Sequence, residues 1–209
     1  MAIDRRDVIQ ILRDENELLK TRNRQVGNRL ARLQQAFRVL NDLDTKTRNL
    51  SRKIDIAELI KQLLELVLHT CNTENGSLLL IDEDSQQLEF VEVIGNSRDA
   101  LLNHRINMDI GIVGSSIKTG KAILVENVHS TSKKWSSSVD KYLSFHTQSL
   151  MCVPLELEDR IIGAIEMVNH VGDPVFDEND LNVLRVAACY VARALDRAEK
   201  LMIPSEINK

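Results

Sequence analysis

Aromatic residues are scarce in this sequence of 209 residues. It contains one tryptophan, two tyrosines and four phenylalanines, and its formal net charge is −4. Single-stranded nucleic acid binds by stacking its bases on aromatic side chains, and duplex DNA binds to strongly basic surfaces. The composition therefore argues against binding of nucleic acid by the chain as a whole.

Long apolar runs and cysteine pairs are also missing. Uncharged apolar runs such as residues 78–81 are far shorter than the roughly 20 residues of a membrane-spanning helix, and the first residues do not form a secretory signal. Cys71, Cys152 and Cys189 are widely spaced and belong to no CxxC motif. We expect three buried thiols, neither a disulfide framework nor a zinc site, and a cytoplasmic protein with no membrane partner.

Proline and glycine are nearly absent from the first quarter of the chain. No proline precedes Pro154, and Gly27 is the only glycine before Gly76. Residues 1–53 carry a net charge of +6, whereas residues 54–209 carry −10. The sequence thus predicts a basic N-terminal helix over residues 1–50, a globular domain over 51–203 and a short tail over 204–209.

The N-terminal helix has the heptad pattern of a coiled coil. Apolar residues recur at two positions of each heptad from Ile9 to Leu40, interrupted only by Asn16 and Asn23. Asparagine inside such a seam pairs best with the same asparagine of a parallel partner, which favours a parallel homodimer. The alternative is a single amphipathic helix that lies on its own domain. The polar segment 41–47 predicts a break or a register shift.

Beyond residue 53 the pattern changes to that of an α+β domain. A helix begins after Asp55 as N-cap and closes at Asn75-Gly76. Short β-rich runs are expected at 77–81, 88–94, 122–128, 148–156 and 160–169. The last two are joined by the tight turn Glu158-Asp159, and a final helix is expected over 177–201.

Three stretches of this domain, in their order and spacing, carry a resemblance to a known family. They are residues 109–114 with 119–123, residues 147–155, and residues 161–169 followed by Phe176. Over about residues 52–201 the chain resembles the GAF domain, a small-molecule sensor module. The resemblance implies an antiparallel sheet of about six strands, terminal helices on one face and a ligand pocket on the other.

The resemblance also implies which residues line that pocket. Asn127, Thr147, Ser149 and Glu166 would be polar groups within an apolar wall, although Glu166 faces either the pocket or water. Trp135 would be a lid over a planar ligand or an anchor of its own loop. The complete set of expected ligand-binding residues is Ser77, Leu79, Ile94, Ile112, Val113, Asn127, Trp135, Thr147, Ser149 and Glu166.

The ligand class is only partly indicated. The glycine-rich segment 111–114 predicts a helix start whose N–H groups attract an anion, or else a turn that holds no ligand. Cyclic-nucleotide-binding GAF domains share Asn169, Phe176 and Asp180, but His170 and Leu181 depart from their motif. A nucleotide or another anionic molecule is therefore a candidate ligand, and no cofactor is assigned.

Other activities lack their signatures. No cysteine lies between Cys71 and Cys152, which argues against covalent bilin attachment and against the methionine-sulfoxide reductases of this family. A haem or redox sensor would need an axial histidine such as His104, His129 or His146. Since no HExxH, GxSxG or P-loop motif is present, we do not expect an enzyme.

The sequence therefore predicts a non-enzymatic sensory module. Its ligand would change the packing of helices in a homodimer formed by the coiled coil and the terminal helices, with output to an unidentified signalling protein. The rival hypothesis is a structural dimerisation or partner-docking protein whose pocket is filled by its own side chains.

Overall fold

A computed structural model describes residues 5–48, 56–128, 147–171 and 175–202. The chain separates into two compact units, Met1–Asn41 and Asp42–Lys209. None of the described helices combines the length and the apolar character needed to cross a bilayer.

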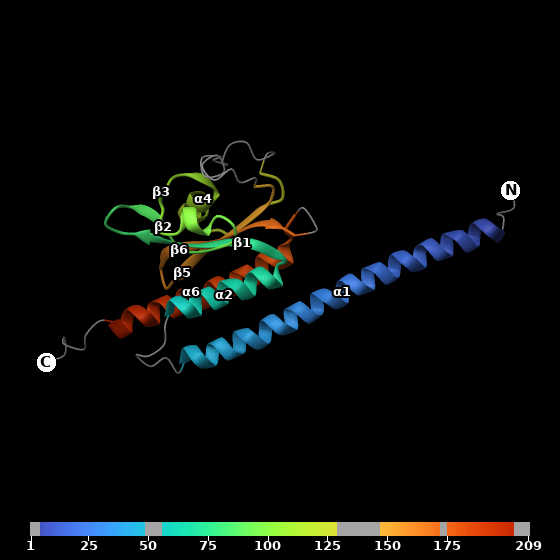
Figure 1. Cartoon of the computed structure of the whole chain (residues 1–209), viewed down its shortest axis with the longest axis horizontal. Coiled ribbons are helices and arrows are strands. Elements are labelled where there is room, and N and C mark those ends of the chain that lie inside the picture. Colours follow the sequence, from blue (N-terminus) through green and yellow to red (C-terminus); the bar gives the residue numbers. More distant parts are fainter. Residues whose placement is uncertain (1–4, 49–55, 129–146, 172–174, 203–209) are drawn as a thin grey trace. The chain divides into compact units, whose positions relative to one another are not determined.

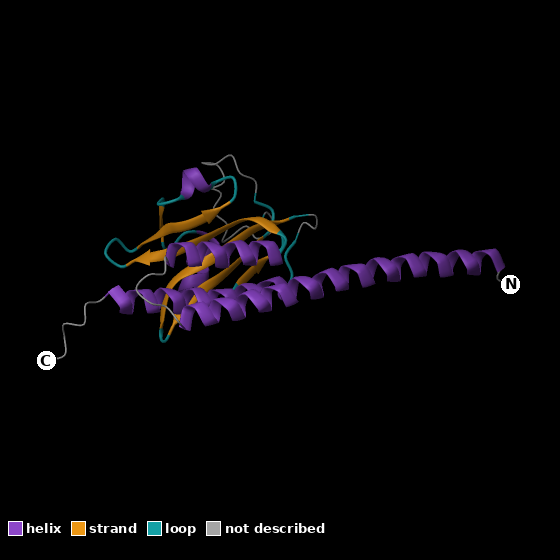
Figure 2. Ribbon diagram, turned by 60° about the horizontal axis from the view of Figure 1, so that its bottom comes forward, coloured by secondary structure: helices purple, strands orange, loops and turns teal. Residues whose placement is uncertain are grey.

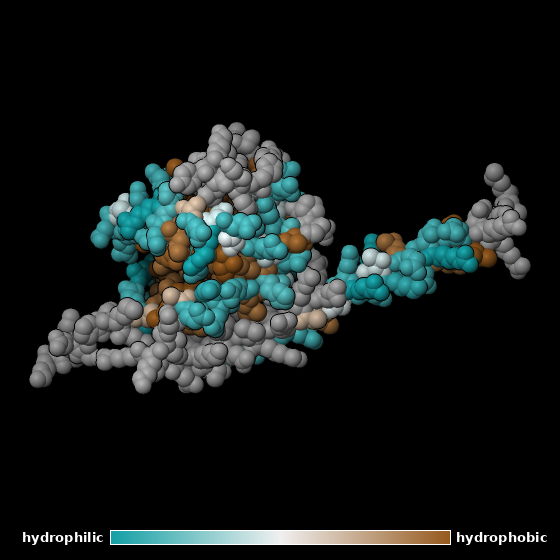
Figure 3. Space-filling model, viewed as in Figure 1, coloured by the Kyte–Doolittle hydropathy of each residue, from teal (hydrophilic) through white to brown (hydrophobic). Residues whose placement is uncertain are grey.

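Helix α1 (Arg5–Arg48) occupies the predicted N-terminal segment and continues through residues 41–47 without interruption. The expected break is therefore absent from the helix itself, because that segment is polar but contains neither glycine nor proline. The apolar seam residues whose side chains are described are exposed, including Leu12 at 58% and Val26 at 63%. Brown apolar side chains accordingly lie among hydrophilic ones on the N-terminal part of α1 (Figure 3).

Helix α2 (Ile56–Thr70) buries one apolar stripe, which includes Ile60, Leu63 and Val67. Its end differs from the prediction, because the helix stops before Asn72, which takes the left-handed conformation with φ of 51°. Asparagine tolerates this conformation better than most residues, so it ends the helix in place of the expected glycine. Residues 75 and 76 instead lie within the first strand, and Asp55 lies outside the described residues.

The described strands form one antiparallel sheet of six, which confirms the predicted α+β fold class. The strand order is β3-β2-β1-β6-β5-β4. The strands are β1 (Thr73–Asp82), β2 (Gln87–Ile94), β3 (Arg105–Asn107), β4 (Ile123–Val125), β5 (Leu150–Leu157) and β6 (Arg160–His170). Strand β3 and the short helix α3 (Arg98–Leu101) were not predicted, since three or four residues are too few to show a period.

Helices cover both faces of the sheet (Figure 1). Helix α2 and the final helix α6 (Glu178–Met202) pack side by side against one face, and Figure 2 shows them lying across the strands. Helix α4 (Gly111–Thr119) covers the other face. Its Ile112, Val113 and Ile117 join an apolar cluster with Leu79, Leu150, Cys152 and Ala164 of the sheet.

The three cysteines are free thiols, but only two of them are buried. Cys71 and Cys152 lie in the core, whereas Cys189 is exposed, contrary to the prediction. The reason is its place on α6, where its exposed neighbours Val186 and Arg193 lie on the same face at helical spacing.

Candidate ligand-binding site

A row of four side chains crosses the sheet beneath helix α4. Cys152 of β5 pairs with Glu166 of β6, Glu166 pairs with Ser77 of β1, and Ser77 pairs with Val93 of β2. Residues that lie directly opposite each other in a sheet point to the same face. Since Cys152 and Val93 belong to the cluster under α4, Glu166 and Ser77 also face α4. We call these four residues the cross-sheet row.

Helix α4 contacts this row through Ser116, which is fully buried. The Ser116 hydroxyl donates a hydrogen bond to the carbonyl oxygen of Lys121 at 2.8 Å and also lies within hydrogen-bonding reach of the Cys152 thiol. Burial, reinforced by the carboxylate of Glu166, raises the pKa of Cys152 well above its ordinary value. A buried thiol whose pKa is raised in this way is a weak nucleophile.

The start of α4 is held close to the preceding chain. A side chain at Gly114 would overlap the carbonyl oxygen of Met108, so glycine permits this approach. The N-cap residue Ile110 makes no side-chain hydrogen bond to the helix start. The first turn therefore has backbone N–H groups that its cap residue does not satisfy, at the end of the helix that favours negative charge.

Three more of the expected residues, Asn127, Thr147 and Ser149, lie in one region, just after the end of β4 and just before the start of β5. The Val128 N–H donates to the carbonyl oxygen of Gln148 at 2.9 Å, which joins the segments that hold Asn127 and Thr147. The Asn169 side-chain oxygen accepts a hydrogen bond from the Gln148 N–H at 2.7 Å.

Ser149, in the same region, is fully buried. Its hydroxyl oxygen has no hydrogen-bond partner among the described residues. A buried hydroxyl without a partner is costly, which makes this position suited to an additional polar group.

Eight of the ten expected residues thus fall into two groups. Ser77, Leu79, Ile112, Val113 and Glu166 meet between the sheet and α4, and Asn127, Thr147 and Ser149 lie at the β4–β5 end. Ile94 follows Val93 on β2, so strand alternation directs it toward the opposite face. Trp135, like His129 and His146, lies outside the described residues, and His104 is exposed.

Two residues of the site were not predicted, Ser116 and Cys152. Cys152 lies within the stretch 147–155 that carries the resemblance, and its alternation with Met151 and Val153 on one strand was the available signal. Ser116 could not be found in this way, because its contact with Cys152 joins a helix to a strand 36 positions further along the chain.

The residues compared above with the motif of cyclic-nucleotide-binding GAF domains lie between the end of β6 and the start of α6, where they contact one another. The rings of His170 and Phe176 meet edge to face with centroids 5.6 Å apart, and Phe176 is buried. Asp177 and Asp180 cap α6 reciprocally: the Asp180 N–H donates to the Asp177 carboxylate, and the Asp177 N–H donates to that of Asp180, both at 3.0 Å. Asp180 therefore has a capping role.

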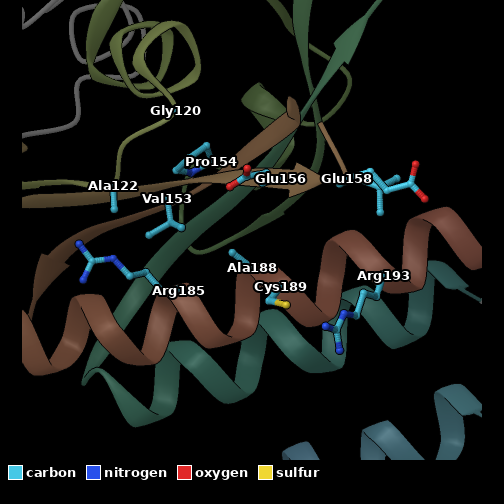
Figure 4. Close-up of a pocket in the computed structure, with 11 residues that line it drawn as sticks. Gly120, Ala122, Val153, Pro154, Glu156, Glu158, Arg185, Ala188, Cys189 and Arg193 are labelled. Carbon is cyan, nitrogen blue, oxygen red and sulfur yellow. The ribbon is translucent and has the colours of Figure 1, made fainter. Parts of the chain in front are cut away.

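A separate open cavity of about 580 Å³ lies between β5 and α6 (Figure 4). None of the ten expected residues lines it. Its lining residues are Gly120, Ala122, Val153, Pro154, Glu156, Leu157, Glu158, Arg185, Ala188, Cys189 and Arg193. Across the described part of the chain, no group of three or more His, Cys, Asp or Glu side chains is arranged to hold a metal ion.

Comparison with known proteins gives both a family and a fold. The GAF domain family model matches residues 53–196. A probable 3',5'-cyclic phosphodiesterase, pde-5 of Caenorhabditis elegans, is 26% identical over 137 residues, which cover 61% of this chain and 18% of that protein. The chain thus spans about a fifth of the length of that curated relative.

Solved structures share the fold at low sequence identity. A GAF domain of a phosphoenolpyruvate-protein phosphotransferase from Coxiella burnetii superimposes with a TM-score of 0.67 at 11% identity, covering 79% of this chain and 95% of that one. Free methionine-R-sulfoxide reductase of Neisseria meningitidis does so with a TM-score of 0.60 at 18% identity, covering 76% of this chain and 88% of that one. GAF domains are generally regulatory sensor domains, although this last neighbour is an enzyme. The matched segment, the six-stranded antiparallel sheet and the helices on its two faces together show that this chain belongs to the GAF domain family.

Proposed function

We propose that this protein is a non-enzymatic sensor that binds a small anionic molecule between helix α4 and the sheet. The observation that carries the proposal is the cross-sheet row, in which Ser77 and Glu166 present polar groups to α4 from within an apolar wall. The start of α4, to which the N-cap residue Ile110 gives no side-chain hydrogen bond, would hold the negative charge, and Glu166 would accept hydrogen bonds from donors elsewhere on the ligand. The Cys152 thiol, buried and held in its protonated form, supports a binding role over catalysis.

A cyclic nucleotide is the first ligand to test. It carries one negative charge for the helix start and base N–H groups for a carboxylate, and the related pde-5 protein is named a probable 3',5'-cyclic phosphodiesterase. The departures at His170 and Leu181 lie near the start of α6, away from the cross-sheet row. They do not remove the groups to which we assign binding.

We further propose that the protein works as a parallel homodimer through α1. The seam side chains are exposed in the single chain, as expected of a surface that a second helix would cover. Asn16 and Asn23 would fix the register. Free thiols at Cys71, Cys152 and Cys189 support a reducing, cytoplasmic location.

A second function has an observation in its favour. The apolar cluster beneath α4 contains Phe90, Leu101 and Val128, all of them buried, so the space between sheet and helix is largely filled by the protein itself. This arrangement supports a structural dimerisation or partner-docking protein with a self-filled pocket. The two functions differ in whether any small molecule stabilises the domain.

Thermal unfolding of the full chain with cAMP, cGMP, amino acids or haem tests the proposal. A ligand at about 100 times its Kd stabilises the native state by about 2.7 kcal/mol, which for a domain of this size raises Tm by roughly 5–10 °C. We expect such a shift with a cyclic nucleotide, and a loss of affinity of about tenfold or more in Glu166→Gln.

Glu74→Gln is the matched control, because Glu74 is also on the sheet but exposed. It should bind as the unchanged protein does. No shift with any compound would contradict the sensor and favour the self-filled pocket.

A further inference from the structure

The outer edge of strand β5 is only partly paired. On one side β6 pairs with the whole strand, Leu150–Leu157, but on the other side β4 pairs only with Leu150–Cys152. Strand β4 cannot extend further, because the chain just before it leaves the end of α4 through Gly120, in the left-handed conformation with φ of 65°. Among the described strands none lies beside the outer edge of Val153–Leu157, which we call the open edge.

The open edge offers backbone hydrogen-bonding groups. The Gln148 carbonyl oxygen accepts a hydrogen bond from the chain that follows β4, and the Ser149 carbonyl oxygen accepts one from β6, both at 2.9 Å. Backbone groups alternate in direction along an antiparallel strand, and the irregularity beyond Leu155 adds its extra residue to β6, so the alternation of β5 continues. The carbonyl oxygens of Pro154 and Glu156 and the Glu156 N–H therefore point outward.

The cavity between β5 and α6 runs along the open edge. It is lined by Val153, Pro154 and Glu156 of β5, and by Gly120 and Ala122, which precede β4. Figure 4 shows β5 and α6 running in the same direction on two sides of it. Its volume of about 580 Å³ lies within the range of ligand-binding pockets. The place that a longer β4 would fill is thus hollow.

Helix α6 lines this cavity with three exposed side chains, Arg185, Cys189 and Arg193. Arg185 donates a hydrogen bond to Asn182 at 2.7 Å and lies 3.8 Å from the Glu178 carboxylate, whereas Arg193 has no ion pair within the described part of the chain. The two arginines are eight residues apart, or about 12 Å along the helix. In an extended segment the first, third and fifth residues share one face and span about 13 Å, so acidic residues at its two ends would match the arginines.

The β5 side of the cavity carries the opposite charge. Glu156 and Glu158 line it, and both are exposed. By strand alternation the Glu156 side chain is on the α4 face of the sheet, as Cys152 is. The second and fourth residues of a segment paired with β5 would lie on that same face, where basic side chains would be complementary to Glu156. A fitting segment therefore carries acids on one face and bases on the other.

We propose that the open edge binds an extended segment of a partner protein as a seventh strand, with acidic residues toward α6 and basic residues toward Glu156. In strand addition of this kind, main-chain hydrogen bonds give affinity and alternate side chains give specificity. Pro154 removes one donor from the edge, which restrains indiscriminate pairing and leaves selection to the charges. The proposal does not depend on ligand binding beneath α4.

Disulfide capture of short peptides by the full chain is the first test, because Cys189 lies midway between the two arginines. The capped peptides Glu-Lys-Cys-Lys-Glu and Lys-Glu-Cys-Glu-Lys have the same composition and charge, and differ only in which charges share a face with the cysteine. Each is supplied as its mixed disulfide with 2-mercaptoethanol, which the Cys189 thiolate displaces. We expect the first peptide to remain bound at a several-fold higher concentration of 2-mercaptoethanol, measured by intact mass, and to lose this advantage at high salt.

Arginine variants connect this preference to α6. Arg185→Gln with Arg193→Gln should abolish the preference, and Arg185→Glu with Arg193→Glu should reverse it. The control is Asp84→Cys in a chain with Cys189→Ser, which moves the exposed thiol to the β1–β2 turn and should capture both peptides equally. Equal capture of both peptides by Cys189, or a preference that survives the double glutamine variant, would overturn the proposal.

Pairing with the backbone of β5 has a separate test. In a strand beside β5, the N–H groups of alternate peptide residues point toward β5 and the others point away. N-methylation of the cysteine in one peptide, and of the lysine before it in another, should therefore weaken capture of only one of the two. Equal capture of the two methylated peptides would mean that the contact is ionic and that no strand is added, which overturns the proposal.

Discussion

At the scale of single residues, the site depends on positions where a strand turns a polar group inward. Glu166 lies between Ile165 and Met167 on β6, and both of these neighbours are buried on the face of the sheet that α2 and α6 cover. Because side chains alternate along a strand, the Glu166 carboxylate points toward α4 on the other face. Its partners across the sheet are Ser77 and Cys152. The close approach of strands β1 and β6 that creates this pairing depends on a residue without a side chain.

Gly163 is that residue, and we predict that Gly163→Ala destabilises the domain. An added Cβ would overlap the carbonyl oxygen of Leu79 and lie 3.0 Å from the Cα of Leu80. Because these are backbone atoms in a paired strand, relief requires the sheet to shift, at a cost of about 1–3 kcal/mol or more. Urea unfolding monitored by circular dichroism measures this loss.

The control is Gly27→Ala, since nothing lies within 4 Å of a Cβ at that exposed helical position. There alanine should be neutral or should stabilise helix α1 by up to about 1 kcal/mol. Equal effects of the two substitutions would show that β1 and β6 do not approach as closely as described.

At the scale of elements, the helices divide into two kinds. Helices α2, α4 and α6 each bury a stripe against the sheet, whereas the described seam side chains of α1 remain exposed. An isolated helix gains little from its own hydrogen bonds, and the proposed coiled coil would cover the exposed apolar seam of α1.

The proposed pairing of α1 predicts the effect of removing its asparagines. Asn16→Leu with Asn23→Leu should raise Tm for the loss of helicity, because the seam becomes fully apolar, and should produce species larger than a dimer, because the register signal is lost. Sedimentation equilibrium and circular dichroism measure the two effects.

Thr21→Leu is the matched control, because Thr21 is exposed on α1 but lies outside the seam. It adds a similar apolar side chain and should leave the dimer unchanged. If the double variant also stays a dimer of unchanged stability, the prediction of a coiled coil is wrong.

At the scale of the whole molecule, signalling would require that ligand binding at the α4 site changes the contacts between the two copies of the dimer. The α4 site lies on one face of the sheet and helices α2 and α6 lie on the other, so any coupling crosses strands β1, β5 and β6. A ligand shifts helix packing only by its different affinity for the two arrangements.

We predict that a bound ligand changes the distance between the two copies of α6. Spin labels on Glu199→Cys, in a chain whose exposed Cys189 is replaced by serine, should show a shift on the order of 1–2 Å, the scale of interface helix movements. The same label on Ala31→Cys, at an exposed position of α1 outside the seam, reports whether the change reaches the coiled coil. Unchanged distances at both positions, at saturation with a ligand that raises Tm, would contradict signalling through helix packing.

Most elements of this protein could be predicted from the sequence because their signals are local. The heptad from Ile9 to Leu40, the strands around the turn Glu158-Asp159 and the stripe of the final helix each show a period within about ten residues. The stretches that resemble the GAF domain predicted the sheet of six strands, which the structure confirms, whereas the ligand site that they imply stays a prediction. The prediction of where α2 ends was wrong, because the helix ends at Asn72 in the left-handed conformation and not at the expected Asn75-Gly76.

Tertiary structure alone decided the side of the sheet on which each candidate residue lies. A period of two shows that Glu166 alternates with Ile165 and Met167, but both faces of this sheet are covered by helices, so alternation cannot say which face holds the site. The same holds for Cys189, whose exposure follows from how α6 rotates on β5. The sequence by itself therefore determined the elements and the family, because periods and motifs are local, whereas the cross-sheet row arises only when distant segments pack.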